Sequence, residues 1–405
     1  MLLLKEEDEI FLKETSELRI SGCSFLSLPN EGFPRATNLK HLSVDSLNYF
    51  HLFKGVFPYL ETIEIDRVND LIFGELLLAT GKHLRKLTVK RSDIKVIPNL
   101  GLHEAKKLSL LEFDGCHVTS IAGGAIFNAN NSNAELSVRI LNSVVSEISE
   151  DGINVIGEEF VIRNSTLENL NARSVTAATR RRFLIAESRF DNVSSDSLHV
   201  KSPSLNVSSN EFARLPDTFL SDLHVTVTSS STHQVVTGDD IIFDDEDEPR
   251  VKIDFVGNKI DNIDLSAFFL KLRYRELNFE RNRINCDCSP ARTAVFKLST
   301  LFPGLSPMAN MTAYETIIEN NFCSEQKISL SEYGRQFLEN NSICAEGGAD
   351  LSTLNDAPTE MNDVSDEPEP QKNRLAIGDA SQINSFIFWP LITLTTTLYS
   401  LLKRQ

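Results

Sequence analysis

The chain repeats a short frame of apolar and polar residues along most of its length. Residues 277–284 read LNFERNRI, an alternating apolar pair followed by an asparagine and a further apolar residue. Residues 205–212 (LNVSSNEF) and 253–260 (IDFVGNKI) have the same frame. Because side chains alternate between the two faces of a β-strand, each frame predicts a short strand with one buried face.

The frames recur at a nearly constant interval. Their second apolar residues are Ile20, Val44, Ile65, Val89, Phe113, Ile140, Ile162, Ile185, Val207, Phe255 and Phe279. Successive positions are 21 to 27 residues apart, except for one interval of 48 that a degenerate frame around Val225 is expected to divide. This period is typical of leucine-rich repeats, whose units bury their apolar faces only by stacking. We therefore expect a solenoid of about 12 repeats over residues 18–285.

The position that Asn282 occupies in the frame of residues 277–284 is called here the slot. In every frame the slot residue is expected to turn the chain at the end of the strand. The slot holds Cys23, Leu47, Val68, Ser92, Cys116, Ser143, Ser165, Ser188, Asn210, Asn258 and Asn282. Amide and hydroxyl side chains there can satisfy backbone groups inside a core without water. Cys23 and Cys116 are expected to be buried and reduced, because they lie four repeats apart, too far for a bridge.

A second fold shares this period. A parallel β-helix has coils of similar length, and the short repeats between Ile140 and Val207 would suit it. Some β-helix proteins are enzymes that degrade polysaccharides, and such an enzyme would need paired carboxylates. Among the outward strand positions, only Glu64 lies near other acids, Asp45 and Asp66. The cysteines after the last repeat favour the leucine-rich repeat instead.

These late cysteines are Cys286, Cys288, Cys323 and Cys344. The segment reads NCDC at residues 285–288, has an apolar run over residues 295–301 and ends in IC at residues 343–344. It resembles the cysteine-rich C-terminal flanking domain of extracellular leucine-rich repeat proteins, the class that includes Slit, Toll-type receptors and connectin.

The resemblance implies an α/β solenoid, a leucine-rich repeat horseshoe with a parallel β-sheet on its concave face and a disulfide-bonded C-terminal cap over residues 286–346. It also implies that disulfides join Cys286 to Cys323 and Cys288 to Cys344. A zinc site is the alternative for four cysteines, but structural zinc prefers Cys-x-x-Cys pairs. We expect no metal and no other cofactor.

Disulfides and N-glycosylation signals favour an oxidising, extracellular compartment. Six asparagines stand in Asn-x-Ser/Thr sequences: Asn130, Asn164, Asn192, Asn206, Asn310 and Asn340. The first residues, MLLLKEED, carry no secretory signal, and residues 1–17 are expected to be a truncated or disordered start. That start favours a cytosolic repeat scaffold as the alternative, which free thiols at the four late cysteines would support.

The last part of the chain changes in composition. Residues 347–384 are acidic and rich in Pro, Ser and Thr, which predicts a disordered stalk. Residues 385–405 form a hydrophobic tail that predicts a membrane anchor. Small residues upstream of it, at Gly378, Asp379, Ala380 and Ser381, are candidate sites for a lipid (GPI) anchor, with a transmembrane helix as the alternative. The expected location is the extracellular face of the plasma membrane.

Charge and the remaining motifs exclude other classes. The formal net charge of −17 disfavours nucleic acid, because phosphate binding needs a basic field. The eight histidines lack metal-ligand spacing, and no phosphate-binding glycine loop is present, so we expect no enzyme. The acidic run over residues 239–248 is expected to be a solvated insertion, with a calcium site as the alternative. The arginines at 180–182 are expected to be an exposed turn, with contact to heparan-type sugars or to a partner's acids as the alternative.

The residues that alternate with the buried pairs define the concave face of the predicted sheet. Most are polar. The expected binding residues are the apolar Leu141, Val161, Leu184 and Ala186 with the bordering Arg139 and Arg163. Apolar clusters rimmed by charge are typical of partner sites. We expect adhesion, recognition or a co-receptor role through binding of another cell-surface or secreted protein, either homophilic or heterophilic.

Overall fold

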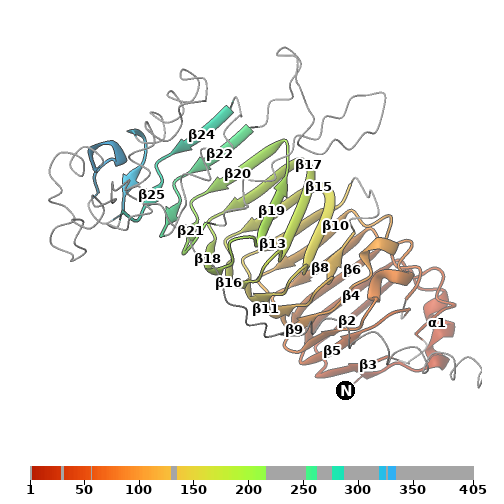
Figure 1. Ribbon diagram of the computed structural model, residues 1–405. Helices are drawn as coiled ribbons and strands as arrows, with labels where there is room; N and C mark the ends of the chain where they lie inside the picture. Colours follow the sequence, from red (N-terminus) through yellow and green to blue (C-terminus); the bar gives the residue numbers. More distant parts are fainter. Residues whose placement is uncertain are drawn as a thin grey trace, which may run out of the picture. The chain divides into compact units, whose positions relative to one another are not determined.

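A computed structural model of the chain describes residues 2–28, 32–55, 57–128, 135–215, 252–261, 276–286, 319–324 and 327–333. These residues form a parallel β-solenoid, in which the chain passes alternately through two sheets of stacked strands (Figure 1). The expected solenoid with a parallel sheet is confirmed.

The first sheet contains the alternating frames found in the sequence. The eleven strands of its main path, in order, are β2 (Glu17–Ser21), β4 (His41–Leu47), β6 (Thr62–Val68), β8 (Lys86–Lys90), β10 (Leu110–Asp114), β13 (Ser137–Leu141), β15 (Ile153–Arg163), β17 (Val175–Ala186), β20 (Ser204–Ser208), β22 (Lys252–Val256) and β24 (Glu276–Glu280). The frames pair in register, so that Ile20 lies opposite Val44 and Phe255 opposite Phe279. The alternating apolar residues therefore stack into one core.

The second sheet follows the turn in each coil. Its strands, in order, are β1 (Leu2–Leu3), β3 (Phe25–Ser27), β5 (Tyr49–Leu52), β7 (Leu71–Phe73), β9 (Asp93–Ile97), β11 (His117–Ile121), β14 (Val144–Ile148), β16 (Thr166–Leu170), β18 (Arg189–Val193), β21 (Glu211–Phe212), β23 (Lys259–Ile260), β25 (Arg283–Ile284) and β26 (Phe322–Cys323). Buried residues such as Phe190 and Phe212, whose rings stack 4.7 Å apart, complete the core from this side.

Helix is scarce in the described ranges. They contain the α-helix α1 (Glu9–Lys13) and the 3-10 helices η1 (Glu6–Asp8), η2 (Leu77–Thr80) and η3 (Leu102–Glu104), and residues 319 and 330–333 are also helical. The expected α/β character is not what these coils show, because the chain returns through a second parallel sheet. No helix in this part of the chain is long and apolar enough to cross a membrane.

In the middle coils the first sheet branches into a third parallel surface. The first halves of the long strands β15 and β17 pair with β12 (Ile126–Phe127) and β19 (Leu198–Lys201). β15 continues from this surface into the first sheet at Gly157, where a Cβ would lie 2.2 Å from the carbonyl oxygen of Leu136. Glycine alone fits so close a backbone approach. These are the coils whose short spacing also suited a parallel β-helix.

The slot residues form a hydrogen-bonded ladder inside the turns. The amide oxygen of Asn258 accepts the backbone N–H of Asn210 at 3.0 Å, and its amide nitrogen donates to the carbonyl of Val207 at 2.9 Å. Asn282 repeats both bonds one coil later, with Asn258 and Phe255. All three slot asparagines are buried. The ladder satisfies backbone groups that each turn would otherwise leave buried without a partner.

Serine and cysteine continue the ladder toward the N-terminus. Hydroxyls of Ser143, Ser165 and Ser188 each accept the backbone N–H of the preceding slot residue at 3.0 to 3.2 Å. The thiol of Cys116 is buried and takes the same place, donating to the carbonyl of Val89. Burial raises the pKa of this thiol to about 11, so it stays protonated. Cys23 differs from expectation, since it is only half-buried.

The chain also differs from expectation at the 48-residue interval. Strand β20 pairs directly with β22, with Val207 opposite Phe255. The slot residues Asn210 and Asn258 also bond directly. No repeat therefore stands between these two strands in the sheet, and the degenerate frame around Val225 lies outside the described residues. A long connection between two paired strands costs only slightly more free energy than a short one, because the entropy of loop closure changes slowly with length.

The first coil differs from the disordered start expected over residues 1–17. Strand β1 pairs in parallel with β3, and the side chain of Leu12 in α1 is buried in the core. An apolar residue near the end of the stack thus covers part of the first coil.

The C-terminal end of the described solenoid carries the expected first bridge. A disulfide joins Cys286 to Cys323, with 5.4 Å between their Cα atoms. Asn321, just before Cys323, adds one more rung to the ladder by accepting the backbone N–H of Asn282 at 2.9 Å. The hydroxyl of the buried Tyr333 donates to the carbonyl of Cys286. The cysteines Cys288 and Cys344 lie outside the described residues, as does most of the predicted cap.

Candidate binding face

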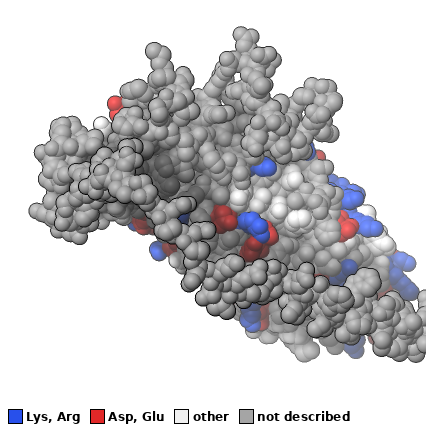
Figure 2. Space-filling model, in the orientation of Figure 1, with Lys and Arg blue, Asp and Glu red and all other residues white. Residues whose placement is uncertain are grey.

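The outer face of the first sheet, on the side away from the core, presents side chains in columns that cross the coils. The central column holds Arg19, Ser43, Glu64, Thr88, Glu112, Arg139, Val161, Leu184, Asn206, Asp254 and Asn278. The pairing register therefore matches the columns expected from the sequence. Lysine and arginine lie interspersed with aspartate and glutamate over the described surface seen in Figure 2.

The six predicted binding residues lie together on three neighbouring strands. In the central column Val161 has Arg139 on one side and Leu184 on the other, and in the next column Arg163 stands between Leu141 and Ala186. Val161 is 5% exposed and Ala186 8%, although neither belongs to the core cluster. Leu141 and Leu184 are half-buried. The apolar side chains most open to a partner are therefore Leu141 and Leu184.

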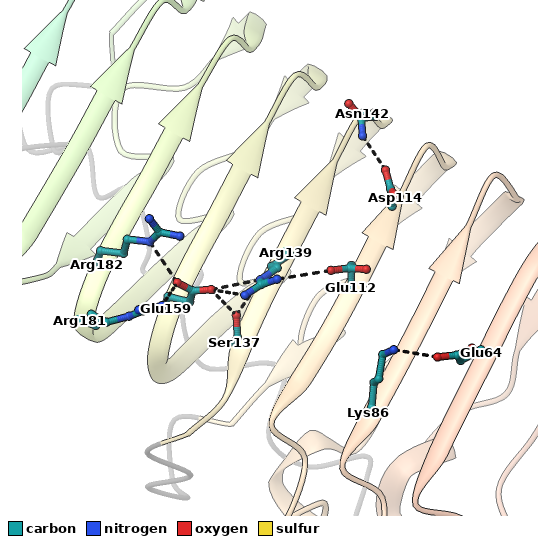
Figure 3. Close-up of polar contacts among 10 residues, drawn as sticks. All are labelled: Glu64, Lys86, Glu112, Asp114, Ser137, Arg139, Asn142, Glu159, Arg181 and Arg182. Atoms are coloured by element: carbon teal, nitrogen blue, oxygen red, sulfur yellow. Dashed lines mark hydrogen bonds and ion pairs between the residues drawn. The ribbon is translucent and has the colours of Figure 1, made fainter. Parts of the chain in front are cut away.

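Beside this spot lies a buried carboxylate held by three arginines (Figure 3). One oxygen of Glu159 accepts hydrogen bonds from Arg139 at 2.6 Å and from Ser137 at 3.0 Å. Its other oxygen accepts from Arg181 and, at 3.1 Å, from Arg182. The Glu159 side chain is only 1% exposed. Both oxygens are thus fully engaged, as a buried carboxylate requires.

A strand irregularity brings the two neighbouring arginines to one carboxylate. Gly157 pairs with Thr179, whereas Glu159 pairs with Arg182, so β17 contains one more residue than β15 over this step. A β-bulge of this kind redirects side chains that would otherwise alternate. Arg181 and Arg182 consequently both reach Glu159.

Glu159 with its partners Ser137, Arg139, Arg181 and Arg182 is called here the Glu159 cluster. The partners keep Glu159 ionised. Burial by itself raises the pKa of this carboxyl group, but the hydrogen bonds from Arg139, Ser137 and Arg181 and the charge of Arg139 outweigh that effect. The resulting pKa is about 2. At neutral pH the group is therefore a carboxylate that orients three guanidinium groups.

Other acids on this face are also matched with cations from the next coils. Lys86 binds Glu64 at 2.8 Å, Arg67 binds Asp45 at 2.6 Å, and Arg91 binds Asp66 (Lys86 and Glu64 are drawn in Figure 3). The hydrogen bond from Lys86 lowers the pKa of Glu64, and that from Arg67 lowers the pKa of Asp45. Glu64, Asp45 and Asp66, the carboxylates that a polysaccharide-degrading enzyme would need, are therefore all engaged in ion pairs. No group of three or more potential metal ligands occurs among the described residues.

The other predicted sites are described only in part. Asn164 and Asn192 are exposed, and Asn206 is half-buried in the central column. The amide of Asn164 donates to the side chain of Asn142 at 2.8 Å, and that of Asn192 to Asn169 at 3.0 Å. The remaining predicted sites fall outside the described residues: Asn130, Asn310, Asn340, Gly378, Asp379, Ala380 and Ser381, with the stalk over 347–384 and the tail over 385–405.

The alternation within the repeats predicted the columns, but it did not predict the Glu159 cluster. The arginines at 180–182 were expected to form an exposed turn, whereas Arg181 and Arg182 are part of a strand and bind Glu159. Glu159 stands two residues before Val161, a spacing that placed it on the outer face. The bulge that delivers the arginines lengthens the step from Ile162 to Ile185 to 23 residues, between steps of 22, which is too small a change to reveal a bulge in the sequence. No family model matches this chain, and the comparison with curated proteins found no relative.

Proposed function

We propose that this protein is a cell-surface recognition protein of the leucine-rich repeat class, which binds another protein through the outer face of its first sheet. The observation that carries the proposal is the juxtaposition on this face of half-buried leucines, Leu141 and Leu184, with partly exposed guanidinium groups. Apolar centres bordered by arginine are typical of protein interfaces. The ladder of slot asparagines supports the class, and the Cys286–Cys323 disulfide supports an oxidising compartment.

The face is tested by the double substitution Leu141→Glu with Leu184→Glu. The full chain, supplied with a secretory leader, is displayed on otherwise non-adhesive cells, and clustering with the same cells or with untransfected cells is counted. We expect the double variant to reach the surface in folded form and to lose clustering. The control is Val96→Glu, which places a charge on an exposed apolar residue of the second sheet. Normal clustering of the double variant would contradict the proposal.

The hydrophobic tail is proposed to tether the protein to the membrane by a lipid anchor. Phosphatidylinositol-specific phospholipase C should then release the displayed chain from the cells. Retention after treatment would indicate a membrane-spanning segment instead.

A glycan-active enzyme is the second candidate, which the third parallel surface of the middle coils favours. The ion pairs of Glu64, Asp45 and Asp66 weigh against it, because a general acid needs a raised pKa rather than a matched cation. Release of reducing ends from a polysaccharide by the purified chain, abolished by Glu64→Gln, would establish this alternative.

A further inference from the structure

In the Glu159 cluster three guanidinium groups share one buried carboxylate, and two further carboxylates lie at its edge. Three guanidinium groups, those of Arg139, Arg181 and Arg182, converge on the single buried carboxylate. The next acids are more distant, with Glu158 at 3.5 Å from Arg181 and Glu112 at 3.8 Å from Arg139. Arg180, on the same strand, adds a further exposed cation. The cluster therefore offers an excess of guanidinium donors at the surface.

These donors face outward. The side chains of Arg139, Arg181 and Arg182 are 37%, 58% and 45% exposed, although the carboxylate that they share is buried. Arg182 uses Nε toward Glu159, and within the described residues its two terminal nitrogens have no other hydrogen bond. A guanidinium group binds a carboxylate best through two parallel N–H donors. Within the part of the chain that the structure describes, Arg182 thus presents a pair of unbonded donors from a fixed position.

We propose that these three arginines form a pre-organised site for an aspartate or glutamate side chain of the partner protein. The inference rests on the proposed function and specifies the chemistry of its binding face. Glu159 acts as a positioning residue, because its buried oxygens fix the guanidinium groups before the partner arrives. Ordering long side chains in advance removes an entropic cost that binding would otherwise carry.

The apolar neighbours favour an acidic protein segment over a sulfated glycan. Leu184 follows Arg182 by two residues on β17, so the two lie on the same face, about 7 Å apart along the strand. A protein segment with an acidic residue two positions from an apolar one matches this spacing when it lies extended along the strand. A sulfated glycan has no apolar group for Leu184, and it binds mainly through the number of cations, which Glu159, Glu158 and Glu112 reduce here.

The experiment measures binding of a fluorescein-labelled peptide of alternating glutamate and leucine to the full chain by fluorescence anisotropy. A lysine–leucine peptide and heparin serve as competing probes. We expect the acidic peptide to bind and Arg182→Ala to weaken it about tenfold or more, because a charged hydrogen-bond pair is lost. The matched control, Arg189→Ala, removes an arginine of similar exposure that pairs with Asp191 on the second sheet, and it should leave binding unchanged.

Two further variants separate positioning from net charge. Arg182→Lys keeps the charge but removes the planar pair of donors, so we expect weaker binding; equal binding would overturn the proposal. Glu159→Gln makes the cluster more positive, so general attraction predicts tighter binding, whereas loss of positioning predicts weaker binding. Arg182→Lys alters only an exposed side chain, which keeps the test valid if Glu159→Gln does not fold.

The outcomes for the site and for the proposed function are distinguishable. Binding of heparin in preference to the acidic peptide, with no loss in Arg182→Lys, would indicate a general cationic surface and reject the carboxylate site. Cell clustering that depends on Leu141 and Leu184 would then still support the binding face. Conversely, Arg182-dependent peptide binding without any effect of the leucine variants on clustering would support the site and reject the proposed adhesion.

Discussion

At the scale of single residues, Glu159 shows how a charged side chain can be held on the outer face of a sheet. Isolated burial would drive this carboxyl group to its neutral form. Hydrogen bonds from Arg139, Ser137 and Arg181 reverse the balance and hold its pKa at about 2. Removing one partner of such a cluster is strongly unfavourable, because the remaining charges lose their compensation.

The lowered pKa predicts a defined pH dependence of stability. Because the folded-state pKa of Glu159 lies below the ordinary value of 4.5, its contribution is complete above about pH 4.5 and is lost as the pH falls toward 2. We expect thermal midpoints of the wild-type chain to fall more steeply over this window than those of Glu159→Gln. Glu64→Gln, which removes a partly exposed carboxylate with one cation partner, serves as the control. Parallel curves for wild type and Glu159→Gln would contradict the prediction.

At the scale of elements, the ladder of slot residues links each turn to the next. The residue before the slot has a positive φ, between 45° and 68°, in each of the eleven coils of the first sheet. Such a conformation is unfavourable for residues other than glycine, such as Arg67 or Glu187. The hydrogen bonds of the ladder and the parallel pairing of adjacent coils offset this strain.

Substitution of a central rung should be costly. The Asn258 side chain accepts from Asn210 and donates to Val207 and Asn282, and it is fully buried. Asn258→Ala removes the partner of two buried backbone groups in the preceding coil, the N–H of Asn210 and the carbonyl of Val207, so we expect a loss of about 2–4 kcal/mol in the free energy of unfolding. Asn278→Ala, at an exposed position on the outer face of the adjoining coil, should change stability by less than about 0.5 kcal/mol. Urea unfolding compares the two, and equal effects would show that the ladder adds little.

The direct pairing of β20 with β22 makes a second prediction at this scale. Shortening the connection over residues 216–251 to the length that joins β18 to β20 should leave the stack intact, because the strands on either side pair without it. We expect a thermal midpoint close to that of the wild-type chain. A large loss of stability would instead show that this connection packs against the coils.

At the scale of the whole molecule, stacked coils expose apolar surface at each end of the stack, and the ends must be covered. The Cys286–Cys323 bridge ties β26 to the last coil of the second sheet, and Tyr333 packs beside it. The bridge closes a loop of 37 residues. It therefore restricts the unfolded chain as well as covering the core.

Loss of this bridge should destabilise the C-terminal end. Cys323→Ser is expected to lower the free energy of unfolding by about 2–4 kcal/mol, with hydrogen exchange increased first in β24, β25 and β26. Peptide mapping of the wild-type chain without reduction should recover the Cys286–Cys323 pair and a free thiol at Cys116. Free thiols at all the late cysteines, with unchanged stability of the variant, would favour a cytosolic scaffold.

The sequence alone determined the features that depend on local alternation and on the repeat period. The eleven inward frames, the slot positions and the outward columns all follow from these two periods, because stacked parallel strands keep equivalent residues in register. The bridge between Cys286 and Cys323 followed from the resemblance of the late cysteine pattern.

Tertiary structure decided the features that depend on which strand becomes a neighbour. The second sheet replaced the expected helices, because segments such as Glu211–Phe212 are too short to show a period and become strands only beside the previous coil. The direct pairing across the 48-residue interval and the bulge that brings Arg181 and Arg182 to Glu159 are likewise properties of strand pairs. Pairing between distant segments is set by burial and hydrogen bonding in the assembled stack, which no single repeat contains.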